Sequence, residues 1–509
     1  MTPIKSRLGW ILVSPFFVLV TPVKANTFYD YLSHKKDEIH QILGKESNDS
    51  FYKVNIGKLS EFDLASTSMH EDLPLVTSSK NQVNQQTKTI ASNEIWLEGN
   101  QELSFVEAVH QALRHRPEIT QSIAMIAGQG ANIDAAKAEY FPQVSGGITT
   151  ADLTTGERGR QLYTLSATQM LYDFGKIKSS VDIEKAKLLQ EQANTLVNID
   201  DIAYQTANAI VNIKRYQEIV RIADQQIKGI ARIAEIANLR ANAGISSQAD
   251  PVQAQSDLEA AESNKIVQEN QLKQYQQKLR NLLGRDVSNQ QIKIPETIVK
   301  NAGLYEQTQF NLVPEMMAAQ AAIQVAKFQK EQTKLSAYPT INVKGSLSQA
   351  LNGTNPNNNK DDGFYNSIML EATSDFFQGG AIRSKQRSAS YAEEAAKAEL
   401  NAVYLDVLDQ VQLIREEIEN KQKQIQTLTA RQQSTTRTKE LYQEQYKLGT
   451  RSVVDLLNSE QAIHSAAQEI ETAKYDIYAN LVQYIKITGR TRDLYQLNNI
   501  SIQGFEIQP

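Results

Sequence analysis

Two long stretches without proline constrain the fold of this chain more than any other feature. Residues 177–243 contain one glycine, Gly229, and residues 382–448 contain neither glycine nor proline. Each stretch has 67 residues. A helix of that length extends for roughly 100 Å at ~1.5 Å per residue. Few globular domains can enclose such a helix. The sequence therefore predicts two long helices that extend beyond an ordinary single-core domain.

The same sequence signals occur twice along the chain, which indicates an internal two-fold repeat. Pro117-Glu118 and Pro142 recur 197 residues later as Pro314-Glu315 and Pro339. A second set recurs with an offset of 205 residues and comprises Gly175 with Gly380, Gly244 with Gly449, Asp250 with Asp455, and Gly284-Arg285 with Gly489-Arg490. One insertion explains the difference, because the polar loop 352–363 is longer than its counterpart 154–161.

Each long stretch ends at a glycine that predicts a turn between antiparallel helices. Gly244 and Gly449 lie where a residue with left-handed backbone ends a helix. Capping boxes at Ser247-x-x-Asp250 and Ser452-x-x-Asp455 then predict return helices of about 35 to 40 residues. A third capping box, Ser104-x-x-Glu107, opens a helical segment predicted near residues 104–141. The sequence therefore predicts two coiled helical hairpins.

Four short segments alternate between apolar and polar residues: 143–153, 162–172, 340–351 and 364–373. Such alternation places one kind of side chain on each face of a strand. For any one segment, a half-buried sheet in a soluble protein is the alternative. At about ten residues, beside such long helices, the segments fit the strands of outer-membrane barrels. Four strands cannot close a barrel, and a bilayer tolerates no open sheet edge, so we expect three chains to supply twelve strands.

The first 25 residues have the pattern of a Sec signal peptide. Lys5 and Arg7 precede an apolar run over residues 8–20, and residues 23–25 fit a small-x-small cleavage site. The run is shorter than the roughly 20 residues of a spanning helix, so we expect cleavage before Asn26 rather than a retained anchor. The net charge of -5 offers no basic field for nucleic acid. Without cysteine, the chain has no disulfide, thiolate metal site or lipidated N-terminal cysteine.

The sequence also lacks the motifs of an enzyme. The segment GQGANI at residues 128–133 lacks the third glycine of a nucleotide-binding loop and follows no predicted strand. The six histidines show no metal-binding spacing, and His110 and His115 are expected at the surface. We therefore expect no catalysis, no cofactor and no metal. A periplasmic adaptor protein is a second alternative class, but it would carry one helical hairpin rather than two.

Four segments resemble the TolC-like family of outer-membrane channels: LSFVEAVHQALRHRPEI (103–119), MLYDFGK (170–176), DFFQGG (375–380) and YKLGTRSVVDLLNSEQA (446–462). The resemblance covers roughly residues 95–490. It implies a mainly α fold with a small β part and a homotrimer in outer-membrane lipid. Long antiparallel hairpins would form an α-barrel that extends into the periplasm, and four transmembrane strands per chain would form a twelve-stranded β-barrel. The implied divisions are a signal peptide (1–25), a polar extension (26–94), two repeats (95–300 and 301–492) and a C-terminal tail (493–509).

The resemblance also implies a gate at the periplasmic tips of the hairpins. Its polar network corresponds to Tyr446, Arg451 and Asp250, and a cation-binding ring corresponds to Asp455. The family's second aspartate is replaced by Asn458, so we expect weaker cation binding here. Helix capping is the alternative role for the two aspartates, and a solvated charge is the alternative for Arg451. The expected docking site for an adaptor comprises Ala243, Gly244, Ile245, Ser246, Leu448, Gly449 and Thr450.

In function, the resemblance implies a passive duct that a periplasmic adaptor and an energised inner-membrane transporter open together. The segment LYDFGK at residues 171–176 and the missing lipid-anchor cysteine favour type I secretion of an adhesin- or toxin-like protein, with an ABC transporter as the pump. Export of small molecules by a multidrug efflux system, driven for example by protons, is the alternative.

Overall fold

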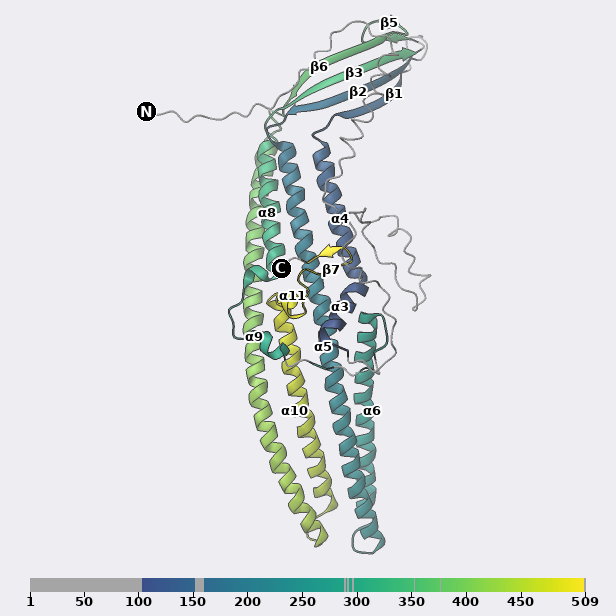
Figure 1. Ribbon diagram of the computed structural model, residues 1–509, viewed down its shortest axis with the longest axis vertical. Helices are drawn as coiled ribbons and strands as arrows, with labels where there is room; N and C mark the ends of the chain where they lie inside the picture. The colour runs from purple at the N-terminus through teal and green to yellow at the C-terminus, as the bar shows by residue number, and fades with distance from the viewer. Residues whose placement is uncertain are drawn as a thin grey trace, which may run out of the picture. The chain divides into compact units, whose positions relative to one another are not determined.

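The computed structural model describes residues 103–151, 160–287, 290, 293–294, 297–351, 353–375 and 377–507. The predicted signal peptide and polar extension lie outside the described residues. Helices dominate the described part of the chain and one small sheet accompanies them, which confirms a mainly α fold with a small β part (Figure 1). Across the same residues, no helix is long and apolar enough to cross a membrane.

Two helical hairpins account for most of the structure, as the sequence predicts. The long helices are α5 (Lys176–Asn242) and α9 (Ala381–Lys447), each of 67 residues. The return helices are α6 (Ala249–Leu283) and α10 (Val453–Ile487), each of 35 residues. Helix α5 packs against both α6 and α10, so the two hairpins lie side by side along the lower part of Figure 1.

The opening helical segment is interrupted, contrary to the prediction of one helix near residues 104–141. It consists of α3 (Phe105–His115) and α4 (Pro117–Ala138), with Arg116 extended between them. The break arises because the ring of Pro117 disfavours helical backbone in the preceding residue. Ser104 makes no side-chain capping bond, so the capping box predicted there is wrong.

The second repeat contains the same kind of break. Helix α8 (Pro314–Leu335) begins at a proline, and the residue before it, Val313, is extended. Helix α8 packs against α5 and α9. A short α7 (Thr297–Asn301) and a 3-10 turn, η2 (Phe310–Leu312), precede it. The predicted repeat is therefore visible in the order of helices.

The four alternating segments form one antiparallel sheet with strand order β1-β2-β3-β6. The strands are β1 (Gln143–Ala151), β2 (Arg160–Tyr172), β3 (Thr340–Leu351) and β6 (Phe364–Thr373). The two repeats meet where β2 pairs with β3. The predicted insertion holds a small hairpin of β4 and β5, at residues 354–355 and 360–361.

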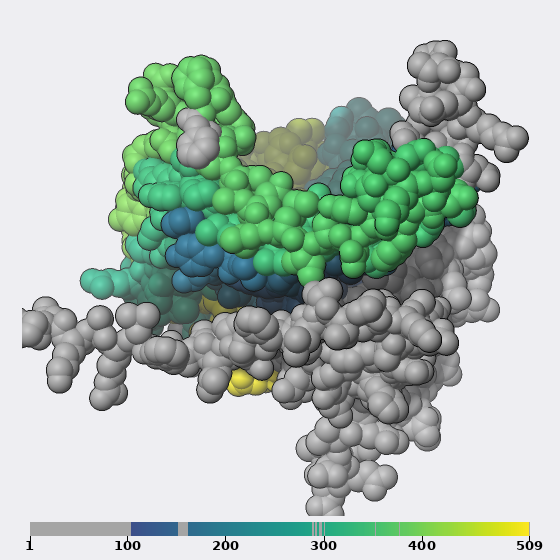
Figure 2. Space-filling model, turned by 90° about the horizontal axis from the view of Figure 1, so that it is seen from above, coloured from purple at the N-terminus to yellow at the C-terminus, as the bar shows by residue number. Residues whose placement is uncertain are grey.

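Side chains of opposite character lie on the two faces of this sheet. On one face, Ser145, Ser166, Ser346 and Ser367 are in register across all four strands. Their hydroxyl groups bond in pairs, Ser145 with Ser166 at 2.8 Å and Ser346 with Ser367 at 2.6 Å. On the other face, Ile368 is 83% exposed. Figure 2, which looks onto the end that carries the sheet, shows the side chains of β3 and β6 in green on its surface.

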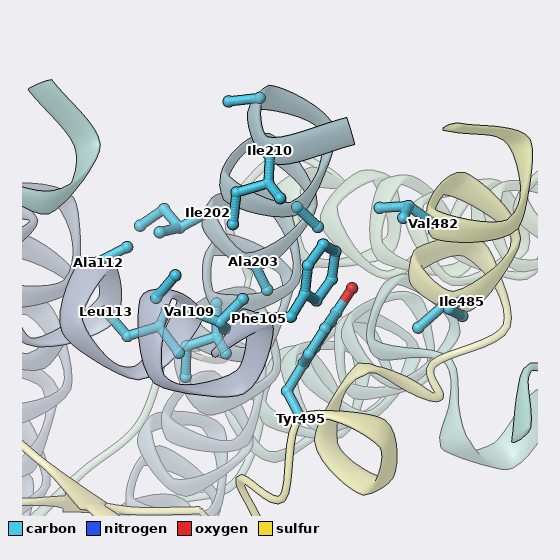
Figure 3. Close-up of a cluster of buried hydrophobic side chains, with 14 of the residues drawn as sticks. Phe105, Val109, Ala112, Leu113, Ile202, Ala203, Ile210, Val482, Ile485 and Tyr495 are labelled. Carbon is cyan, nitrogen blue, oxygen red and sulfur yellow. The ribbon is translucent and has the colours of Figure 1, made fainter. Parts of the chain in front are cut away.

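The main hydrophobic core lies where α3, α5, α10 and the C-terminal segment meet (Figure 3). Phe105 of α3 and Tyr495 are both almost fully buried, and their rings stack with centroids 5.8 Å apart. Figure 3 shows Ile202 and Ala203 of α5 beside them, with Val482 and Ile485 of α10 on the far side of the cluster.

The C-terminal tail is part of this core, although no sequence pattern predicted its structure. It contains α11 (Thr491–Leu494) and a two-stranded hairpin of β7 (Ser501–Ile502) and β8 (Phe505–Glu506). The side chains of Leu497, Ile502 and Ile507 are buried. The tail therefore anchors the opening helix to the end of the second hairpin.

The two histidines expected at the surface are both partly buried, so that expectation is wrong. His110 Nε2 donates to the carbonyl oxygen of Tyr495 at 2.7 Å. His115 packs against Gly284, where a Cβ atom would lie 2.2 Å from His115 Nε2. Both side chains therefore fix α3 against elements that come much later in the chain.

One carboxyl group is buried in the same region. Asp200 of α5 is 3% exposed. Burial raises the pKa of Asp200 from its ordinary 3.8 to about 8, although the nearby Arg492 opposes the shift. Between those pH values the folded chain holds a proton that the unfolded chain has released. The free energy of unfolding should therefore fall as pH rises from about 4 to 8.

Replacing Asp200 with asparagine isolates this contribution, because the side chain keeps its shape and carries no charge at any pH. We expect the apparent melting temperature of the purified protein to fall from pH 5 to pH 8, and to fall less steeply for Asp200→Asn. Asp134→Asn is the control, since that side chain is 66% exposed. Equal slopes for wild type and Asp200→Asn would contradict the raised pKa.

Candidate functional site

The hairpin tips, where the sequence places the gate, are built on two equivalent glycine turns. Gly244 has a φ of +71° and Gly449 a φ of +76°. In each turn the next residue donates its N–H to the carbonyl five positions earlier, Ile245 at 2.9 Å and Thr450 at 3.0 Å. This pattern closes a helix with a left-handed residue, which glycine adopts without steric cost. The predicted C′ role of both glycines is confirmed.

The two tips differ in how their return helices begin. The hydroxyl of Ser452 accepts the N–H of Asp455 at 3.3 Å and donates to its carboxylate at 3.0 Å, so this predicted cap forms. In the first hairpin, Ser247 accepts instead from Ala249 at 3.1 Å. The predicted box between Ser247 and Asp250 is therefore wrong, because the helix begins one residue further on. Ser452 is thus the N-cap of α10, and the carboxylate of Asp455 accepts a hydrogen bond from the Ser452 hydroxyl.

Apolar side chains join the two hairpins just above the tips. They form a buried group that we call the tip cluster, which comprises Ile230, Ile233 and Ala237 of α5, Ala254 and Ala261 of α6, Tyr446 of α9, and Val453, Leu456 and Leu457 of α10. Its members recur at intervals of three, four or seven residues along α5, α6 and α10, as in the seam of a coiled coil. The polar groups of the tips are therefore held on a common apolar support.

Tyr446 is the polar member of the tip cluster and is 5% exposed. The guanidinium of Arg240 lies over its ring, 4.8 Å from the centroid. Burial and the nearby charge of Asp250 raise the pKa of Tyr446, and Arg240 opposes them in part. The phenol therefore stays neutral at physiological pH. Its hydroxyl has no hydrogen-bond partner within the described part of the chain.

Arg451 is bonded within its own hairpin. Its Nε donates to Gln445 at 2.9 Å, and its Nη1 lies 3.6 Å from the carboxylate of Asp455. The guanidinium also covers the ring of Tyr442, 4.3 Å from the centroid. Among the described residues of a single chain, Tyr446 and Asp250 thus lie near each other, but Arg451 makes its contacts elsewhere.

Sequence reasoning missed Arg240, which contacts Tyr446 from the last turn of α5. A basic residue in the last turn of a long helix is a recognisable signal, because cations are favoured at helix C-termini. The ring contact itself depends on how the two hairpins pack. Sequence spacing does not reveal that packing.

The outermost residues of the tips are exposed, as a docking surface requires. Ile245 and Leu448 present large apolar side chains that are 63% and 79% exposed. Of the other expected docking residues, Ser246 is half-buried and Ala243, Gly244, Gly449 and Thr450 are exposed. Asn458 is also exposed, one helical turn beyond Asp455. Within the described ranges, no group of three or more His, Cys, Asp or Glu side chains is placed to hold a metal.

Comparisons with known proteins agree with this architecture. The family model described as outer membrane efflux protein matches residues 108–285 and 310–490. The outer membrane protein TolC of Escherichia coli K12 is 23% identical over 431 residues, covering 78% of this chain and 84% of TolC. The alkaline protease secretion protein AprF of Pseudomonas aeruginosa is 25% identical over 164 residues, covering 32% of this chain and 34% of AprF.

The solved structure of the outer membrane protein VceC from Vibrio cholerae has the same fold. It superimposes with a TM-score of 0.66 at 16% sequence identity, covering 76% of this chain and 96% of VceC. The family match lies within the two repeats and covers most of each, and it does not include the residues before 108.

Replacing Gly449 with alanine tests the need for glycine at the left-handed position of this turn. A Cβ atom there meets nothing within 4 Å, so its cost comes from the positive φ alone. A left-handed alanine costs about 1–2 kcal/mol, so hydrogen exchange of the amides around residues 446–452 should accelerate about 5- to 30-fold. Gly128→Ala, in the interior of α4 with equal free space, should leave its own exchange unchanged or slower. Unaltered exchange in Gly449→Ala would contradict the analysis.

Proposed function

Because this chain belongs to the outer membrane efflux protein family, we propose that three copies assemble into a duct that exports protein from the cell. The chain is an outer-membrane channel that extends into the periplasm, and it is not an enzyme. In the proposed assembly, periplasmic adaptors dock on the hairpin tips and an inner-membrane transporter supplies the energy. The duct itself only opens and closes.

The four-stranded sheet is the main observation in support of a trimer. Strands β1 and β6 are its edges, and each offers a row of backbone groups to a further strand. Ile368 and Leu370 of β6 are 83% and 70% exposed, which suits contact with lipid. A bilayer does not tolerate unpaired sheet edges, and four strands are too few to close into a barrel. Joining β6 of one copy to β1 of the next closes a barrel of twelve strands.

We place the gate at the tips, at Tyr446, Arg451, Asp250, Asp455 and Asn458. Burial of Tyr446 beside Asp250 supports a link between the two hairpins of one chain. Arg451 is 39% exposed at its side chain, so it can reach a neighbouring copy. Opening then requires the hairpins to move apart as the coiled coil untwists.

A ring of three Asp455 carboxylates is proposed to attract cations at the closed tip. The same carboxylate already accepts a bond from Ser452 and lies near Arg451, which reduces its free negative charge. Asn458, one turn away, contributes no charge. Cation binding should therefore be weak.

Type I secretion of a large protein, through an ABC transporter, is the function we favour. The similarity to a relative named for secretion of alkaline protease supports it. Export of small molecules is the second candidate, since the matching family is named for efflux.

Deleting the gene in its native host distinguishes these two functions. We expect one or more large proteins to disappear from the culture medium and to return on complementation with the intact chain. Susceptibility to dyes, detergents and antibiotics is measured in the same strains. An unchanged set of secreted proteins together with increased drug susceptibility would instead establish the efflux function.

Arg451→Ser should raise the single-channel conductance of the purified protein severalfold in planar bilayers, because it removes the cation from the proposed closed tip. The control is Arg437→Ser, since Arg437 is 72% exposed at its side chain and pairs with Glu440 within α9. Unchanged conductance in Arg451→Ser would remove Arg451 from the gate.

A further inference from the structure

Gly229 is an unexpected residue in the interior of α5. Glycine in a helix interior is less stable than alanine, and the matching helix α9 contains no glycine. The structure shows what replaces the missing side chain. A Cβ atom on Gly229 would lie 1.6 Å from Oε1 of Glu460 and 2.6 Å from its Cδ. The glycine therefore leaves a space that the carboxyl group of Glu460 fills.

Glu460 belongs to α10 and is 3% exposed, which is unusual for a carboxylate. Its carboxylate pairs with Nζ of Lys439, which comes from α9, and with Nε2 of His464 at 3.2 Å. Burial opposes ionisation, but the bonds from His464 and Lys439 outweigh it and lower the pKa of Glu460. The group is thus a buried charge with a partner from each helix of its hairpin.

We propose that Glu460 is a positioning residue for channel opening, which holds the second hairpin against the first in the closed state. We call Gly229, Lys439 and Glu460 the hairpin latch. The latch is separate from the proposed gate at the tips, because Glu460 lies about two helical turns beyond the start of α10. The inference rests on the proposed function, since it assumes that the channel opens by movement of the hairpins.

The latch fits one register of the two hairpins. If α10 moved along α5 by one helical turn toward the tip, Glu460 would meet Ile233 in place of Gly229, and Ile233 already fills the tip cluster. If the hairpins separated, the carboxyl group would lose its contact with α5, whereas its bonds to Lys439 and His464, which lie within the second hairpin, would persist. Buried ion pairs add little to overall stability, but removing one partner leaves an expensive unpaired charge. The space at Gly229 therefore fixes the register of α10 on α5, and the ion pair holds the carboxyl group of Glu460 in that space.

Two substitutions test the latch from opposite sides. Gly229→Ala fills the space and leaves every charge in place, whereas Glu460→Gln keeps the shape and removes the charge. We expect both to raise the mean conductance of the purified full-length protein severalfold in planar bilayers. Gly128→Ala is the matched control for the first, because a Cβ there meets nothing. Glu471→Gln is the control for the second, because Glu471 pairs with Lys474 inside α10.

A double substitution separates a latch from general destabilisation. If Lys439 and Glu460 act together, Glu460→Gln combined with Lys439→Gln should conduct no more than Glu460→Gln alone. Lys439→Gln also serves if Gly229→Ala does not fold, because Lys439 is 24% exposed at its side chain and His464 still contacts the carboxylate of Glu460. A fall in melting temperature without a change in conductance would overturn the latch.

Arg451→Ser, measured in parallel, distinguishes failure of the latch from failure of the proposed function. If Arg451→Ser raises conductance while Gly229→Ala, Glu460→Gln and Lys439→Gln match wild type, the latch is overturned and the gated channel stands. If no form of the protein conducts, the proposed channel fails together with the latch.

Discussion

The backbone hydrogen bonds of the sheet edges constrain everything else in this molecule. Strands β1 and β6 end the sheet within one chain, and their outward N–H and C=O groups need partners before lipid can surround them. Pairing of β1 with β6 in the same chain cannot supply those partners, because four strands are too few to close a barrel. Association of copies satisfies the edges, and the same association brings the helical hairpins together beneath the sheet.

Packing within and between the hairpins keeps the long helices folded, although the mean hydropathy of the chain is only -0.44. Apolar side chains are limited to seams such as the tip cluster, and the main core is placed near the middle of α5. Long helices derive most of their stability from packing of one face rather than from intrinsic propensity. The proposed gate at the tips therefore rests on a few contacts, as expected of a part that moves.

Local signals in the sequence were sufficient for the hairpins and strands. Proline-free runs, the paired glycines Gly244 and Gly449 and the period-two segments each fix backbone geometry within a few residues. The interruption before Pro117 was also encoded locally, in the proline itself. The burial of Tyr495 against Phe105 and the closeness of Gly229 to Glu460 were not, because each joins residues hundreds of positions apart. Tip residues were placed by resemblance, and Arg240 was missed because its partner lies on another hairpin.

The row of serines across the sheet has a consequence for what passes along it. If three copies close the barrel with this face inward, Ser145, Ser166, Ser346 and Ser367 repeat around the circumference as a collar of neutral hydroxyl groups. A hydroxyl group both donates and accepts hydrogen bonds, so it can bond to water or to a peptide, and it carries no charge. At the level of this row the wall would then offer hydrogen bonds rather than charge, whereas Lys344 and Glu371 add charges elsewhere on the same face.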